Sequence, residues 1–113
     1  MTQEKNEPAE FPGALAHKLS ELIDFAPGAV VSRTFVKGGT GTLTLFAFEQ
    51  GEGLSEHSAP FDAWVQVLEG RVLLTIGGQP VEAGPGDMVR MPANVPHAVK
   101  AVQRLKMLLT LFK

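Results

Sequence analysis

Residues 57–70 read HSAPFDAWVQVLEG, and the second half of this stretch decides the fold class. A period of two in the side chains is typical of a β-strand, because successive residues point to opposite faces of a sheet. The sequence from residue 63 onward has that period, with one row containing Val65 and Val67 and the opposite row containing Trp64, Gln66 and Leu68. Glu69-Gly70 then ends the predicted strand in a tight turn.

The same alternation continues on both sides of this strand. The segments AVVSRTFVK (29–37) and TLTLFAFEQ (42–50) flank GGTG (38–41), which predicts a hairpin. Residues 79–101 supply short strands broken by Pro and Gly, and RLKMLLTLF (104–112) follows as a further strand. Short strands with turn signals between them favour an all-β sandwich or barrel over a parallel α/β sheet.

The N-terminal part has a different character. Residues 1–12 are polar and contain Pro, so we expect a flexible tail, with a single domain over residues 13–113. Within PGALAHKLSELIDFAPG (12–28), Leu15, Leu19 and Leu22 fall on one helical face, and Pro27-Gly28 stops the pattern. The sequence therefore predicts one short N-terminal helix that covers the barrel.

Composition limits the classes of function. The chain has 113 residues, a net charge of −2 and no cysteine, which favours one domain and gives no general attraction to nucleic acid or anionic lipid. The absence of cysteine excludes disulfides and thiolate metal sites. The N-terminus has no apolar signal core and no apolar run is long enough to span a membrane, so we expect a soluble, cytoplasmic protein.

The strand at 104–112 has apolar side chains on both faces. One row contains Leu105, Met107, Leu109 and Leu111, and the other contains Leu108 and Phe112. A small barrel has a single interior, so the second apolar face needs a cover, either the N-terminal helix or a second subunit. We therefore expect a homodimer.

Two glycine-bounded motifs carry a family resemblance. The first contains Gly51, His57, Ala59, Ala63 and Gly70, and the second contains Gly86, Pro92, Asn94, His97 and Ala101. In their spacing the chain resembles the cupin superfamily, in the compact form of small bacterial single-domain, conserved-barrel proteins. The resemblance implies a double-stranded β-helix, also called a jelly-roll barrel.

The resemblance also implies a metal site that this chain has partly lost. Cupins that hold a metal use two His and one Glu from the first motif and one His from the second. The corresponding residues here are His57, Ala59, Ala63 and His97, so the ligand set is incomplete. Asp62, beside the lost Glu position, is a candidate extra donor for a weakly held divalent transition metal such as Zn, Ni, Fe or Mn.

Several interpretations of the two histidines stay open at this point. They either bind a small molecule, or belong to a metal-dependent enzyme of dioxygenase or isomerase type, or line a barrel mouth in a non-catalytic interaction module. Whether the chain is an enzyme is left open as well. The predicted ligand-binding pocket consists of His57, His97, Phe61, Val65, Val67 and Met91.

Overall fold

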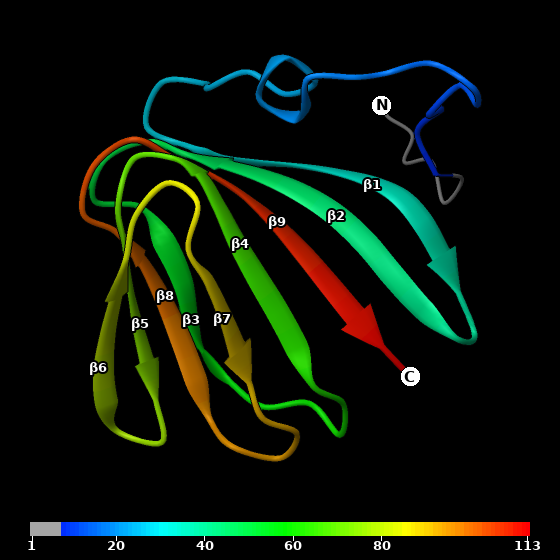
Figure 1. The fold of residues 1–113 in the computed structure, drawn as a ribbon. Helices are drawn as coiled ribbons and strands as arrows, with labels where there is room; N and C mark the ends of the chain where they lie inside the picture. The colour runs from blue at the N-terminus through cyan, green and yellow to red at the C-terminus, as the bar shows by residue number, and fades with distance from the viewer. Residues whose placement is uncertain (1–7) are drawn as a thin grey trace, which may run out of the picture.

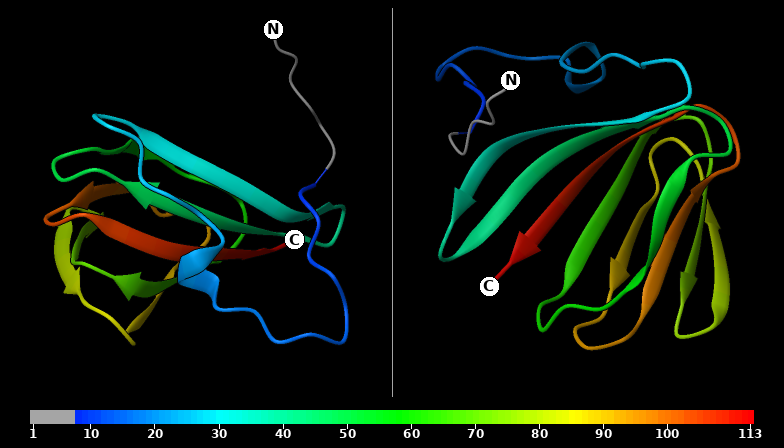
Figure 2. Two further views of the ribbon diagram at one scale, coloured as in Figure 1. Left: turned by 90° about the horizontal axis from the view of Figure 1, so that it is seen from above. Right: turned by 180° about the vertical axis from the view of Figure 1, so that it is seen from behind.

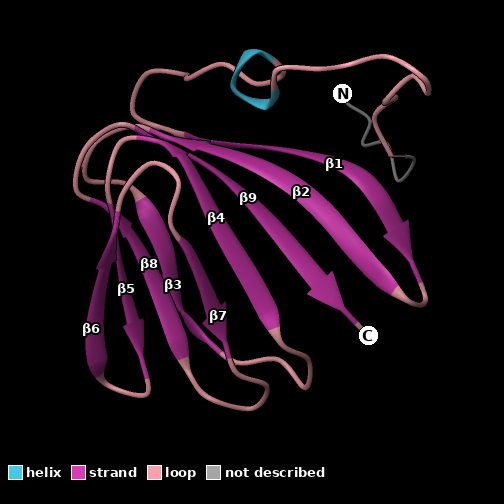
Figure 3. Cartoon of the chain, viewed as in Figure 1, coloured by secondary structure: helices cyan, strands magenta, loops and turns pink. Residues whose placement is uncertain are grey.

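Two antiparallel sheets make up the protein, as described by a computed structural model for residues 8–113 (Figure 1). The five-stranded sheet has the order β1 (Val30–Gly38), β2 (Gly41–Phe48), β9 (Leu105–Phe112), β4 (Ala63–Glu69) and β7 (Met88–Met91). The four-stranded sheet has the order β3 (Gly53–His57), β8 (His97–Ala101), β5 (Val72–Ile76) and β6 (Gln79–Ala83). The predicted all-β jelly-roll architecture is confirmed, and Figure 3 shows how little of the chain is helical.

The main core lies between the two sheets. In β4 the inner row is fully buried, since Val65 and Val67 are 0% and 1% exposed. These residues pair in register with Leu109 and Met107 of β9, so both strands turn the same kind of side chain inward. The other fully buried members of this core include Phe48, Val72, Leu74 and Leu105.

The predicted N-terminal helix is present only as one 3-10 turn, η1 (Leu19–Glu21). A longer helix does not form here. Ala14 has a left-handed backbone with φ of 62°, and no side chain caps the N-terminus of the turn. Leu15, which the helical pattern placed on the apolar face, is 66% exposed. The segment instead lies extended along the sheet beside β1 (Figures 1 and 2).

Cationic side chains of the sheet hold this segment by its backbone carbonyls. Arg33 Nη1 donates to Leu22 O at 2.6 Å, and Lys106 Nζ donates to Ser20 O at 2.5 Å. The ring of Phe25 lies 5.0 Å from Lys106 Nζ and 4.5 Å from the guanidinium carbon of Arg104. Ile23 of this segment is buried against Phe35, Leu45 and Ala47 of the sheet, and the four residues form a second apolar cluster.

The β1 strand is an edge strand with a bulge. Its register against β2 shifts between Thr34 and Val36, which leaves Phe35 as an extra residue. Ala9 N donates to Thr34 O at 2.7 Å, so the chain before the 3-10 turn also contacts this edge. Of the predicted flexible tail, residues 1–7 lie outside the described part of the chain.

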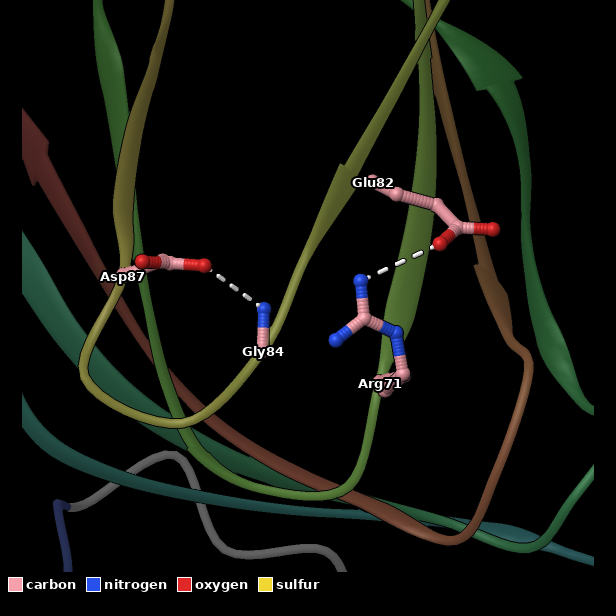
Figure 4. Close-up of polar contacts among 4 residues, drawn as sticks. All are labelled: Arg71, Glu82, Gly84 and Asp87. Atoms are coloured by element: carbon pink, nitrogen blue, oxygen red, sulfur yellow. Dashed lines mark hydrogen bonds and ion pairs between the residues drawn. The ribbon is translucent and has the colours of Figure 1, made fainter.

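Polar contacts lie at the connections from β4 to β5 and from β6 to β7 (Figure 4). Asp87 Oδ2 accepts a hydrogen bond from Gly84 N at 2.9 Å and fixes the turn between β6 and β7. Arg71 and Glu82 form an exposed ion pair at 3.1 Å. Because both partners are solvated, this pair contributes little to stability. Within the described residues, no helix is long and apolar enough to cross a membrane.

Candidate functional site

The two motif histidines face each other across adjacent strands. His57 is the last residue of β3 and His97 the first of β8, and the two are register partners. Their ring centroids are 4.5 Å apart with an interplanar angle of 75°, and the two Nε2 atoms are 3.2 Å apart. His97 is only 3% exposed, whereas His57 is solvent-accessible. The pair therefore connects the barrel interior with solvent.

Backbone carbonyls fix the tautomer of both rings. The Nδ1 atom of His57 lies 2.8 Å from Ser55 O, and that of His97 lies 3.2 Å from Val95 O. A carbonyl oxygen can only accept, so each Nδ1 carries a hydrogen and donates it. In the neutral form of each ring the Nε2 atom then carries a lone pair. At a separation of 3.2 Å the two lone pairs face each other, so a donor group that lies beside both atoms and supplies a hydrogen to each would stabilise the pair.

The local backbone explains why the rings meet. The ladder between β3 and β8 has an irregularity between Leu54 and His57, which turns His57 towards its partner strand. The loop before β8 passes through Asn94 in a left-handed conformation with φ of 66°. Asn94 N donates to Ala59 O at 2.7 Å, which ties the two motif loops together.

An apolar cavity of about 60 Å³ lies beside the two rings. Among residues 8–113, the two imidazoles are the only polar side chains that line it. The methyl groups of Ala59 and Ala63 belong to the wall, at the positions where larger side chains would fill the space. The other residues that line the cavity are Leu54, Met91, Val99, Met107, Leu109 and Leu111.

Comparison with known families identifies the fold. A model of the cupin domain matches residues 44–111, which is more than half of the chain and includes both histidines. The chain belongs to the cupin family. The resemblance of the two glycine-bounded motifs is thereby confirmed.

Solved structures of other cupins and related proteins superpose closely on this cupin. A conserved protein of unknown function from Streptococcus pyogenes is 29% identical with a TM-score of 0.89, over 98% of this chain and 97% of that one. A cupin superfamily protein from Desulfitobacterium hafniense is 26% identical with a TM-score of 0.87, over 94% and 97% of the two chains.

A third relative is more similar in sequence but longer. The cupin 2 conserved barrel domain protein from Leptotrichia buccalis is 37% identical with a TM-score of 0.81, and the match covers 83% of this chain but 46% of that one. A comparison with curated proteins found no match. These relatives support the family and the fold.

The residues of this cupin do not fit a resident metal. Two imidazole donors bound at about 2.0–2.1 Å to a tetrahedral ion would lie roughly 3.3 Å apart, close to the observed Nε2 separation. However, residues 8–113 contain no group of three or more His, Asp or Glu side chains placed to hold an ion. With Ala59 and Ala63 in the cavity wall, water would have to supply the remaining ligands.

The predicted extra donor, Asp62, is engaged elsewhere. Its Oδ1 accepts from Ala93 N at 2.8 Å, and its Oδ2 accepts from Arg90 Nη1 at 3.3 Å. Asp62 therefore braces the loop that leads to His97, rather than joining the imidazoles. The sequence position beside the lost Glu suggested a donor, but the backbone of Ala93 and the side chain of Arg90 take its two oxygens.

The predicted pocket residues fall into two groups. His57, His97 and Met91 line the cavity together. Val65 and Val67 are fully buried in the core and are not among the lining residues, and neither is Phe61, whose ring lies 6.0 Å from Lys113 Nζ. The alternation of β4 indicated the correct face for the two valines but not their depth along the barrel.

Part of the cavity wall was not predicted from the sequence. Met107, Leu109 and Leu111 share one face of β9, as their spacing indicated, but that pattern does not say which end of the barrel is open. Leu54 and Val99 join them from β3 and β8, where they are register partners. A prediction of which strands pair would have placed these two residues in the wall.

Burial changes the titration of His97. Desolvation lowers the pKa of His97 below its ordinary value of 6.5, and the neighbouring His57 lowers this pKa further, against an opposing contribution from the Val95 carbonyl. The unfolded chain then binds more protons than the folded one as the pH falls below about 6.5. His97 therefore makes folding less favourable in acid.

We expect that His97→Gln will weaken the loss of stability between pH 7 and pH 5, because glutamine does not titrate. Urea unfolding of wild type and variant at both pH values measures the difference. His17→Gln, in the N-terminal segment, is the control. Equal pH dependence in wild type and His97→Gln would contradict the role of His97.

Proposed function

We propose that this cupin binds a small molecule at the His57–His97 pair. The observation that carries the proposal is the convergence of two Nε2 acceptors, 3.2 Å apart, at the edge of an apolar cavity. Pockets that combine an apolar wall with a few convergent polar groups are the usual form of small-ligand sites. The irregularity of β3 before His57 and the hydrogen bond from Asn94 N to Ala59 O support this geometry without a ligand.

The chemistry of the wall defines the class of ligand. Both imidazoles offer acceptors in their neutral form, and no cationic side chain from the described part of the chain lines the cavity. The ligand is therefore a molecule with a hydrogen-bond donor at its head: an amino group, which has a hydrogen for each Nε2 atom, or a hydroxyl, which donates to one of them. A carboxylate would bring a third acceptor to the same point and bind poorly.

The volume of the cavity limits what enters it. About 60 Å³ corresponds to roughly two water molecules at about 30 Å³ each. Only the donor head and a short apolar arm fit inside, so the rest of the ligand lies at the mouth beside solvent-accessible His57. The same Nε2 atoms are placed to take a proton from the bound head, which is the acid–base chemistry open to this site.

A thermal-shift panel tests the proposal. The probes are small alcohols and amines of up to about six heavy atoms, each paired with the carboxylate of the same carbon skeleton, with EDTA present. We expect stabilisation by the alcohols and amines and none by the carboxylates. For the amines, whose head donates to both Nε2 atoms, His57→Ala and His97→Ala should each weaken binding by roughly 5- to 10-fold, since each removes one hydrogen bond worth about 1 kcal/mol.

His17→Ala is the matched control, because His17 is the remaining histidine of the chain and forms a hydrogen bond with Pro12 O in the N-terminal segment, away from the cavity. Binding that survives both site variants would overturn the proposal. Stabilisation that appears only when zinc, nickel, iron or manganese replaces EDTA would favour the metal-dependent alternative instead.

A further inference from the structure

One row of side chains continues from the wall of the histidine cavity along the inner face of the five-stranded sheet. Its members are register partners from β7 through β4, β9 and β2 to β1, and in that order they are Met91, Ala63, Leu111, Thr42 and Lys37. Register partners lie on the same face of a sheet. The first three line the cavity, so the last two lie beyond it on the same face. We call these five residues the inner row.

The chemistry of the inner row changes with distance from the histidines. Its members in the cavity wall are apolar, whereas Thr42 adds a hydroxyl group and Lys37 an ammonium group. The neighbouring row changes in the same way, because Leu109 of the cavity wall pairs with Thr44, and Thr44 pairs with Thr34. The hydroxyl oxygens of these two threonines are 3.0 Å apart. In both rows the inner face is therefore apolar at β9 and polar at β2 and β1.

The cationic end of the inner row lies at the same end of the barrel as the histidines. Figure 1 shows the β1–β2 turn and the C-terminus at the end where β3 leads into β4 and β7 leads into β8. Lys113 N donates to Thr40 O at 2.9 Å, and Lys113 Nζ lies 6.0 Å from the centroid of the Phe61 ring. The end of β9 therefore connects the turn that follows Lys37 with the loop that follows His57.

The ammonium group of Lys37 has no carboxylate partner among the described residues. The four ion pairs within residues 8–113 involve Arg71, Arg90, Arg104 and Lys106. Lys37 is exposed, and a cation that no carboxylate compensates attracts anions. Its charge is therefore available to a ligand that extends from the cavity along the inner row.

We propose that the ligand carries a carboxylate at the end opposite its donor head, with an apolar chain between the two, as in an ω-amino carboxylate. This inference rests on the proposed binding of the head at His57 and His97. The head donates to the two Nε2 atoms, the chain lies along Leu109 and Leu111, and the carboxylate meets Lys37. A carboxylate in this place does not oppose the imidazole lone pairs, because it lies away from the cavity, towards β1.

The spacing of the strands limits the length of the ligand. The backbone of Lys37 on β1 lies two strand spacings of about 4.8 Å, or roughly 10 Å, from that of Leu111 on β9. The lysine side chain is flexible and can reach back over part of this distance. A chain of about four to six carbon atoms suits the remaining separation.

NMR titrations of the full chain with EDTA present test this inference. The probes are the alkylamine, the ω-amino carboxylate and the α,ω-diamine of each chain length. Wild type should bind the amino carboxylate about 5-fold more tightly than the alkylamine, which is the gain expected from one exposed ion pair. It should bind the diamine more weakly than the alkylamine, because the second ammonium group meets Lys37. Lys37→Gln should remove both differences, and added salt should reduce them.

Lys100→Gln is the matched control, because Lys100 is an exposed cation of β8 that does not line the cavity, and this variant should keep the preference of wild type. The same spectra show whether each variant is folded. Equal binding of alkylamine and amino carboxylate by wild type, or a preference that survives Lys37→Gln, would overturn this inference and leave the proposed site intact. Alkylamine binding that is unchanged in both His57→Ala and His97→Ala would overturn the proposed site and this inference together.

Discussion

The double variant Ala59→His/Ala63→Glu is expected to hold one divalent transition metal per chain, where wild type holds none after dialysis. Both alanines line the same cavity as His57 and His97. Imidazole and carboxylate at these positions would raise the number of donors from two to four, which is the usual coordination number of zinc in proteins. Their Nε2 and oxygen atoms would meet the two Nε2 atoms that already converge.

The metal-free double variant should be less stable than wild type. Ala63 is 2% exposed, so a glutamate there places a carboxylate in an apolar wall without a partner. Metal at 100 times its dissociation constant would raise the free energy of unfolding by about 2.7 kcal/mol. This gain corresponds to a rise of roughly 10 °C in melting temperature for a domain of this size. Elemental analysis and thermal melts with zinc or with EDTA measure both effects.

Adding His97→Ala to the double variant is the control, because it removes one of the four donors and should abolish retention of the ion. A double variant that folds but retains no more metal than wild type would show that the four positions do not converge. Folding in the presence of zinc keeps the test valid if the metal-free form is too unstable to isolate.

Gly70→Ala is expected to cost about 3 kcal/mol of unfolding free energy, the largest loss we expect from adding a single methyl group. Gly70 has a φ of +81°, where an L-residue is strained by about 1–2 kcal/mol. Its added Cβ would also lie 1.7 Å from Arg104 O and 2.7 Å from Arg104 C. Backbone on both sides would have to move, because no flexible side chain can give way.

Urea or thermal unfolding measures this loss of stability, and Gly39→Ala is the matched control. Gly39 lies in the β1–β2 turn with nothing within 4 Å of an added Cβ. The melting temperature should fall by more than about 10 °C for Gly70→Ala and by a few degrees at most for Gly39→Ala. Similar effects of the two substitutions would contradict the close approach at Gly70.

Much of the architecture could be predicted because the alternation of side chains along a strand indicates which of them face the core. The period of two in β4 and β9 identified the inward rows correctly, and the apolar outer row of β9 predicted that something must cover it. In the described structure the N-terminal segment covers part of that face, over Phe35, Leu45 and Ala47. The homodimer expected for the remainder stays a prediction.

Other features depend on contacts that a single sequence does not report. Only a 3-10 turn forms in the predicted helix, and Lys106 and Arg33 bind carbonyls of this turn and of its C-cap, Ser20 O and Leu22 O. The helical spacing of Leu15 and Leu19 does not indicate these contacts with the sheet. Asp62 was expected near the histidines, but its oxygens accept from Arg90 of β7 and from Ala93 N in the loop after β7. Such contacts join residues far apart in the sequence, so they are fixed only when the whole chain is packed.

The bulge in β1 has a consequence for how the protein meets its neighbours. Because Phe35 is an additional residue, Phe35 and Val36 both turn outward. Phe35 packs against the N-terminal segment, and Val36 lines a surface hollow with Leu43 and Phe112. The interrupted spacing of hydrogen-bonding groups, with Thr34 O already occupied, makes this edge a poor template for adding strands from another chain. The bulge thereby protects this edge from open-ended, amyloid-like growth by strand addition.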